Sequence, residues 1–194
     1  EDSEAARVVE KVFEKEGIKI LRNVEFVKVE KKGTKKTIHI TQNGKPNAIH
    51  GEEILLAVGR SPNVEGLNLD GIGVKYDKRA IAVNGRLQTT VTNIYAVGDV
   101  KGKFLFTHMA GYEAGIALAN ILFKLPWKAD YSVVPWATFS DPELARVGLT
   151  EEEAKEKGVT FEVLKFPFES VDRAQTDNET EGFYKVIVDR KGNI

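Results

Sequence analysis

The feature that most constrains the fold of this chain is the unbroken apolar run in EEILLAVG, residues 52–59. A run without polar alternation is typical of a strand buried on both faces, and such strands occur mainly in parallel sheets covered by helices. Gly59 ends the run, and Pro62 and Asn63 then favour a turn. The run therefore predicts a domain of the α/β class, with residues 52–59 as an internal strand.

The stretch before this run supplies further elements of such a domain. Residues 2–16 place their apolar side chains on one helical face. Asp2 or Ser3 can cap this helix, and Gly17 suits its C-terminal end. The order of a helix, short strands and a buried strand, without a glycine-rich turn from a strand into a helix, is interpreted as the second half of an α/β nucleotide-binding domain. Three short strands are predicted in it, at residues 18–21, 24–30 and 35–41.

Two glycines that follow predicted strands each have a structural and a functional interpretation. Gly59 either belongs to a plain turn or lets a flat ligand ring approach the backbone at the carboxyl edge of a sheet. Gly98 and Asp99 follow a strand predicted over residues 92–97. The Asp99 carboxylate either caps a turn with its own backbone or accepts hydrogen bonds from the hydroxyl groups of a sugar-like ligand.

A helix is predicted over residues 107–123, with Thr107 as its N-cap. The first amides of a helix lack partners within it and carry partial positive charge, so they stabilise an anion placed there. A ligand with a polyol and a ring that can accept negative charge would satisfy Asp99 and this helix start together, and FAD is such a ligand. Small residues, which let a sheet or a ligand lie close, dominate the first two turns: Ala110, Gly111, Ala114 and Gly115.

The third part of the chain is interrupted by prolines and indicates a new domain that begins near Ala129. Thr150 and Glu153 form a capping-box pattern, and Gly158 suits the end of the helix that this pattern opens. Short strands are predicted here at residues 133–140, 161–168 and 182–189. The predicted domain organisation is residues 1–59, 60–128 and 129–194.

The composition argues against several classes of protein. Of the 194 residues 42% are hydrophobic, and the net charge of −1 arises from interspersed basic and acidic side chains. This pattern is not that of a nucleic-acid-binding surface. No apolar run approaches the ~20 residues of a membrane span and no signal-peptide pattern opens these 194 residues, so we expect a cytoplasmic protein without a membrane partner. The sequence contains no cysteine, which removes thiolate chemistry from this chain, and we expect no metal site.

Four segments together resemble one family, the class I pyridine nucleotide–disulfide oxidoreductases. The resemblance covers nearly the whole chain, and the chain is similar to the second half of such an enzyme, in the branch of dihydrolipoamide dehydrogenase, mercuric reductase and glutathione reductase. The four segments occur in the family's order: ILLAVGRSPN (54–63), TTVTNIYAVGDV (89–100), FTHMAGYEAG (106–115) and PWATFSDPELARVGLTEEEA (135–154).

The resemblance implies partial FAD- and NAD(P)-binding Rossmann-like domains followed by the start of an α+β interface domain. It implies an FAD-bound homodimer that passes electrons between NAD(P)H and a small-molecule or protein disulfide, or a similar acceptor. It also implies that Gly59 lies by the NAD(P) nucleotide. By matching motifs, the positions implied to bind FAD are Gly98, Asp99, Phe106, Thr107 and His108.

The family's dinucleotide loops, its CxxxxC redox disulfide and its His–Glu acid–base pair are not found in these 194 residues. We therefore expect no catalytic residue in this chain, and we expect the chain alone to be inactive. Two alternatives remain at this point. One is a flavoprotein of the ferredoxin reductase or NADH oxidase type, which shares the strand–Gly–Asp motif. The other is a non-catalytic module for nucleotide binding or dimerisation.

Overall fold

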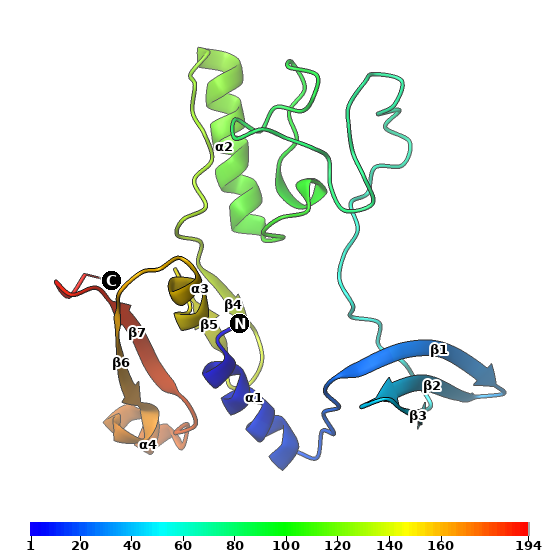
Figure 1. The fold of residues 1–194 in the computed structure, drawn as a ribbon, viewed down its shortest axis with the longest axis vertical. Coiled ribbons are helices and arrows are strands. Elements are labelled where there is room, and N and C mark those ends of the chain that lie inside the picture. Colours follow the sequence, from blue (N-terminus) through cyan, green and yellow to red (C-terminus); the bar gives the residue numbers. More distant parts are fainter. Residues whose placement is uncertain (194) are drawn as a thin grey trace. The chain divides into compact units, whose positions relative to one another are not determined.

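The computed structural model describes residues 1–193, and the chain divides into two compact units. The central unit is Ala57–Val133, and the terminal unit combines Glu1–Leu56 with the chain from Val134 onward. Each unit is described by itself, and Figure 1 shows their elements. The predicted domain boundaries at 59/60 and 128/129 stay a prediction.

The terminal unit begins with the predicted helix, α1 (Ser3–Lys15). The Asp2 carboxylate caps it, because one of its oxygens accepts hydrogen bonds from the amides of Glu4 and Ala5, each 3.0 Å long. Gly17 has φ +86°, a left-handed conformation that glycine adopts without strain. The prediction for this helix is therefore confirmed, with Asp2 rather than Ser3 as the cap.

An antiparallel sheet follows, in the order β1 (Val24–Lys32), β2 (Lys35–Gln42) and β3 (Lys45–Gly51). The strands predicted at 24–30 and 35–41 are confirmed, whereas the one predicted at 18–21 is wrong. The sequence analysis missed β3. Asn43 and Gly44 both have positive φ, as the type I′ two-residue hairpin turn requires, and this turn joins β2 to β3.

The apolar run that opened the sequence analysis does not form a strand. Leu55, Leu56 and Val58 are 92%, 79% and 87% exposed. A strand of this kind is stable only between neighbouring strands under covering helices, and no strand of residues 1–193 pairs with residues 52–59. The prediction of a buried strand is therefore wrong for this structure. The composition of the run shows that it is apolar, but it does not show whether neighbouring strands are there to pair with it.

The C-terminal part of the terminal unit consists of short hairpins and short helices. The strand predicted at 133–140 is shorter than expected and forms β4 (Trp136–Thr138), which pairs with β5 (Leu144–Arg146), a strand that was not predicted. The strands predicted at 161–168 and 182–189 pair antiparallel as β6 (Glu162–Pro167) and β7 (Phe183–Val188). The capping box is confirmed, because Thr150 Oγ1 accepts from the Glu153 amide and Glu153 Oε2 accepts from the Thr150 amide. The remaining elements are α3 (Glu151–Glu156), η2 (Phe168–Ser170) and α4 (Asp172–Asp177).

A cluster of charges joins three elements of the terminal unit. Lys185 of β7 lies within ion-pair distance of Asp2 (2.9 Å), Glu4 (3.3 Å) and Glu151 (2.5 Å). The three acids stand at the starts of α1 and α3, where the helix dipole also favours negative charge. The hydrogen bond from Lys185 is the main reason that the pKa of Glu151 lies below its ordinary value of 4.5. Burial lowers the pKa of Lys185, but its acidic partners outweigh burial and raise it.

We expect Lys185→Met to lower the free energy of unfolding by about 1–2 kcal/mol at pH 7, because three carboxylates lose their common partner. Groups whose pKa is lowered by folding stabilise the fold above their ordinary pKa, and this contribution is lost as pH falls through the folded-state pKa. The difference between parent and variant should therefore shrink below about pH 4.5. Urea unfolding at a series of pH values measures it, with the exposed Lys11→Met as control. A difference independent of pH would contradict the assignment.

The central unit contains one long helix, α2 (Thr107–Phe123), and the 3₁₀ turn η1 (Gly98–Lys101). The helix was predicted with the same bounds and is confirmed. The strand predicted at 92–97 is wrong, because only Tyr95 forms an isolated bridge there, to Gln88. Two groups of buried apolar side chains form the core of this unit: Leu69, Val74, Ile81 and Ala96 in one, and Leu87, Ile116 and Ala117 in the other.

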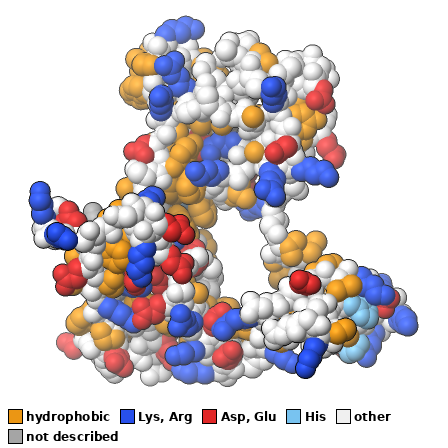
Figure 2. Space-filling view, viewed as in Figure 1, with side chains coloured by type: hydrophobic (Ala, Val, Ile, Leu, Met, Phe, Trp, Pro, Cys, Tyr) orange, Lys and Arg blue, Asp and Glu red, His pale blue; other side chains and the backbone are white. Residues whose placement is uncertain are grey.

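Basic and acidic side chains are interspersed on the face drawn in Figure 2. This agrees with the nearly balanced charge of the sequence. Over residues 1–193, none of the helices combines the length and the apolarity that crossing a bilayer requires.

Candidate cofactor site at the Gly98–Asp99 turn

The Gly98–Asp99 turn opens η1 and packs against α2. Gly98 is buried with φ +71°, and its amide donates a 2.7 Å hydrogen bond to Glu113 of α2. A Cβ at Gly98 would lie 2.9 Å from the Ala110 Cβ. The space beside Gly98 is thus filled by the helix and is not open to a ligand side group. The glycine serves the close approach of η1 to α2.

We expect Gly98→Ala to destabilise the protein by about 1–3 kcal/mol, because the new methyl group overpacks against Ala110 and the backbone has positive φ. Ala110→Gly removes the clash, but by itself it costs about 0.5–1 kcal/mol because glycine weakens the interior of a helix. Chemical denaturation should therefore show that Gly98→Ala is less destabilising in the Ala110→Gly background than in the parent, with the backbone cost remaining. Equal losses in the two backgrounds would show that the clash does not matter.

Asp99 follows directly and presents its carboxylate at the surface. Its Oδ2 accepts a 2.8 Å hydrogen bond from Nη1 of Arg60, and the two side chains are 49% and 67% exposed. The same Nη1 lies 3.4 Å from the carbonyl oxygen of Leu105, shortly before α2. The Arg60 guanidinium therefore links Asp99 to the segment that leads into the helix.

The start of α2 lies close to this ion pair along the chain. Thr107 is the first helical residue, and the N-cap is Phe106, which makes no side-chain capping hydrogen bond. The prediction of Thr107 as N-cap is therefore wrong, since its backbone is already helical. Thr107 and His108 are exposed, and the rings of Phe106 and His108 stack with centroids 5.5 Å apart. The first amides of the helix have no partner within it and are not covered by a capping side chain.

A buried charged cluster, which the sequence analysis missed, lies beneath the turn. Glu113 is fully buried, and its Oε1 lies 2.9 Å from Lys101 Nζ and 3.0 Å from the Tyr131 hydroxyl. Burial, with the Glu113 carboxylate as the next cause, raises the pKa of Tyr131. The available signal was one acid on a mostly apolar helical face. That face also carries Met109, Ile116 and Ala117, with Asn120 as a second polar residue.

Gly59 stands beside this site in the sequence, one residue before Arg60. It is exposed with φ +123°, and nothing lies within 4 Å of a Cβ built on it. The conformation explains why glycine suits this position. Arg60, the residue after Gly59, donates a hydrogen bond to Asp99. Gly59, which is predicted to lie by NAD(P), is therefore the sequence neighbour of the residue that pairs with Asp99, which is predicted to bind FAD.

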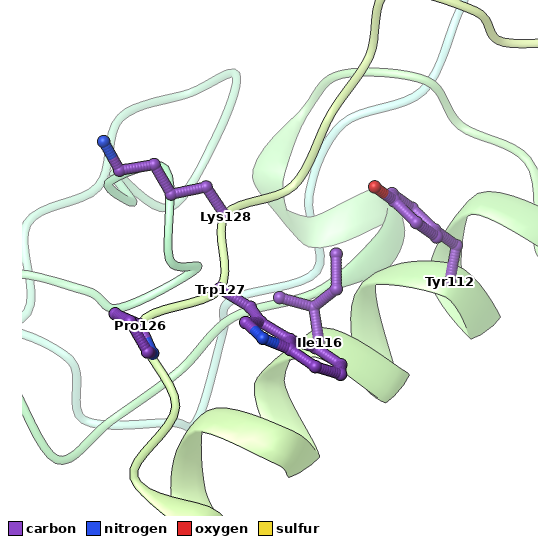
Figure 3. A pocket seen from close by; sticks show the side chains of 5 residues that line it. All are labelled: Tyr112, Ile116, Pro126, Trp127 and Lys128. Atoms are coloured by element: carbon purple, nitrogen blue, oxygen red, sulfur yellow. The ribbon is translucent and has the colours of Figure 1, made fainter.

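A shallow groove lies farther along α2 and contains none of the predicted site residues (Figure 3). Asn120 fixes one wall, because its side chain accepts from the Trp127 amide (3.0 Å) and donates to the Trp127 carbonyl (2.9 Å). The groove is lined by Tyr112, Ile116, Pro126, Trp127 and Lys128.

No group of three or more acidic or histidine side chains suited to a metal ion occurs among residues 1–193.

Comparison with known protein families identifies the family of this chain. Residues 1–114 match the pyridine nucleotide-disulphide oxidoreductase family, and residues 134–194 match the dimerisation domain of the same family. The chain is a pyridine nucleotide-disulfide oxidoreductase family member. Members of this family use FAD and NAD(P)H.

Curated relatives agree with this assignment. A mercuric reductase from Staphylococcus aureus is 39% identical over 188 residues, which cover 96% of this chain and 34% of that protein. A dihydrolipoyl dehydrogenase from Geobacillus stearothermophilus is 34% identical over 194 residues, which cover 100% of this chain and 41% of that protein. The chain thus spans roughly a third to two fifths of the length of these relatives.

A solved structure shows the same fold. The HOCl-induced flavoprotein disulfide reductase RclA from Escherichia coli matches with a TM-score of 0.85 and 30% identity, over 98% of this chain and 43% of that chain. The predicted α/β class, with an α+β domain of the dimerisation type after it, is therefore confirmed.

Proposed function

We propose that the chain is part of an FAD-dependent oxidoreductase that passes electrons between NAD(P)H and a disulfide or similar acceptor. Family membership supports this proposal, as do relatives named mercuric reductase and dihydrolipoyl dehydrogenase. The redox-active cysteine pair of such an enzyme would lie outside this chain, because these 194 residues contain no cysteine. The chain then contributes cofactor-binding groups and part of a dimer interface, and the chain by itself is inactive.

The observation that carries the proposal is the pairing of an exposed carboxylate with an uncapped helix start. Asp99 and the carbonyl of Leu105 share Arg60, so the carboxylate and the entrance to α2 form one continuous site. In our assignment Asp99 accepts hydrogen bonds from the ribityl hydroxyls of FAD, and Gly98 holds the turn through its backbone. The backbone of Phe106, Thr107 and His108 faces the polar edge of the flavin.

The bound flavin would supply the electron-carrying ring that amino-acid side chains lack. The residues of this chain bind and orient it. The α2 amides favour negative charge near the helix start, by about 0.3–1 kcal/mol when exposed and more when buried. Gly59 is assigned to the NAD(P) nucleotide, with its exposed backbone next to Arg60 as the supporting observation.

We further propose a homodimer built through residues 129–194, after the partial NAD(P) domain at 1–59 and the partial FAD domain at 60–128. The match of residues 134–194 to the family's dimerisation domain supports this arrangement. Sedimentation analysis of the full-length protein measures the oligomeric state. A monomer at micromolar concentration would contradict the proposal.

The test of the proposed function is the visible absorption spectrum of the purified full-length protein, followed by titration with NADH or NADPH under anaerobic conditions. We expect a flavin absorption band that bleaches on addition of one of the two nucleotides. A protein that carries no flavin after purification, and binds none when FAD is added, would overturn the proposal. Bleaching without turnover on a panel of disulfides would leave the cofactor assignment standing and overturn a disulfide as the acceptor.

A further inference from the structure

We propose that Glu113 is a positioning residue for FAD: its buried carboxylate ties the Gly98–Asp99 turn to α2 and so sets the spacing between Asp99 and the helix start. This inference rests on the proposed function, since it concerns how the same site is held. Glu113 touches no cofactor in this scheme and acts through Gly98 and Asp99.

The two oxygens of the Glu113 carboxylate bind the two ends of η1. Oε2 accepts the hydrogen bond from the Gly98 amide, 2.7 Å away, at the first residue of the turn. Oε1 pairs with Lys101 Nζ, 2.9 Å away, at the last residue of the turn. One side chain in the second turn of α2 therefore fixes the whole turn that carries Asp99.

The cluster also reaches the segment between the turn and the helix. The side chain of Lys101 is 4% exposed, and its Nζ lies 4.7 Å from the centre of the Tyr131 ring. That ring stacks on Phe104 with centroids 5.3 Å apart, and its hydroxyl donates to Glu113. The turn, the connecting segment and the helix are thus held by one group of side chains, of which Lys101 and Glu113 are buried and Phe104 and Tyr131 are half-buried.

A buried ion pair is a poor source of stability, because well-packed apolar side chains of similar size would hold the same elements at equal or lower cost. An apolar side chain at position 113 could not accept from the Gly98 amide, however. That bond orients the Val97–Gly98 peptide, at the residue before Asp99. The carboxylate is therefore explained by the orientation that it imposes on the turn.

Two matched double variants of the full-length protein test the inference. Lys101→Met/Glu113→Gln removes both charges but keeps an acceptor for the Gly98 amide and a polar partner for Tyr131. Lys101→Met/Glu113→Leu removes the same charges and also the acceptor. For each we would measure the Kd for FAD of the apoprotein, the absorption spectrum of the bound flavin and the thermal midpoint. The exposed Glu65→Gln is the control.

We expect the leucine form to bind FAD about 10-fold more weakly than the glutamine form, and the flavin band to shift only in the leucine form. Equal Kd values and identical spectra in the two folded variants would overturn the inference, because a purely structural role changes the midpoint alone. Should the leucine form fail to fold, Tyr131→Phe replaces it. This variant removes one donor to Glu113 and should weaken FAD binding by about 2- to 10-fold, and an unchanged Kd would overturn the inference.

The two proposals fail in different ways. If the parent protein binds no FAD, the proposed function falls, and the role of Glu113 falls with it. If the parent binds FAD and the variants bind it equally, only the role of Glu113 falls.

Discussion

Replacing Lys101 alone by methionine should destabilise the full-length protein by about 3–5 kcal/mol, since it leaves a buried carboxylate without its counter-charge. Glu113 is 0% exposed and Lys101 is 8% exposed, so water cannot replace the missing partner without rearrangement of the core. Urea unfolding at pH 7 measures the loss. The exposed Lys78→Met serves as the matched control, and we expect it to change stability by less than about 0.5 kcal/mol.

Urea unfolding of the double variant Lys101→Met/Glu113→Leu provides a second test of the same ion pair. Removing both charges should restore much of the stability that the single variant loses, because the cost lies in the unpaired charge and not in the absence of the pair. A single variant that loses under about 1 kcal/mol would show that the pair is not buried as described. Strictly additive losses in the two single variants and the double variant would show that the two side chains are not coupled.

Replacing Asp99 by alanine should weaken FAD binding by the full-length protein by about 10- to 100-fold, the amount expected when hydrogen bonds to a charged group are lost. Because the Asp99 side chain is 49% exposed, protein stability should change little. Equilibrium dialysis against FAD, with the flavin absorption as readout, measures the effect. Asp99→Asn should fall between parent and alanine forms, because it keeps one acceptor and loses the charge.

Arg60→Ala distinguishes a direct role of the carboxylate from an indirect one. It removes the ion partner of Asp99 while leaving the carboxylate in place. A surface ion pair contributes about 0–1 kcal/mol, so this variant should affect FAD retention less than Asp99→Ala does. Equal losses in the two variants would show that the ion pair, and not the carboxylate, carries the effect. Unchanged flavin content in Asp99→Ala would refute the assignment of Asp99.

Local sequence signals predicted α1, α2 and α3 but missed the short helix α4. The bounds of α2 follow from its composition, and the starts of α1 and α3 follow from Asp2 and from the Thr150–Glu153 pair, because caps act on their nearest neighbours. The alternating segments that became β6 and β7 were also found, since each has the other as its partner within the same unit.

Two of the strand predictions that failed have a common cause. The runs at 52–59 and 92–97 have the composition of buried strands, but a strand exists only through the ladder to its neighbours, which composition does not report. β3 was missed for the opposite reason. Its residues are weak strand formers, and the Asn43–Gly44 turn that pairs it with β2 is a strong hairpin signal that was not used.

For the candidate site, Gly98 and Asp99 could be identified from the sequence, but the side chains that hold them in place could not. Gly98 and Asp99 could be picked out as a glycine and an acid after a run of strand composition, and their cofactor roles stay a prediction. The actual neighbour of Gly98 is Ala110, and the cluster beneath it draws on Tyr131, 18 residues beyond Glu113. Such supports depend on how η1 and Tyr131 pack against α2, and spacing along the chain alone does not give that packing.

The ion cluster at Lys185 has a consequence for how the molecule assembles. It joins residues separated by as many as 183 positions, whereas the turn at Gly98 is held to Glu113 by partners only 15 positions apart. Closing short loops costs less entropy and is faster than closing long ones. The central unit can therefore complete its contacts during synthesis, while α1 must wait for β7 to leave the ribosome. Until then Asp2 and Glu4 lack their partner Lys185.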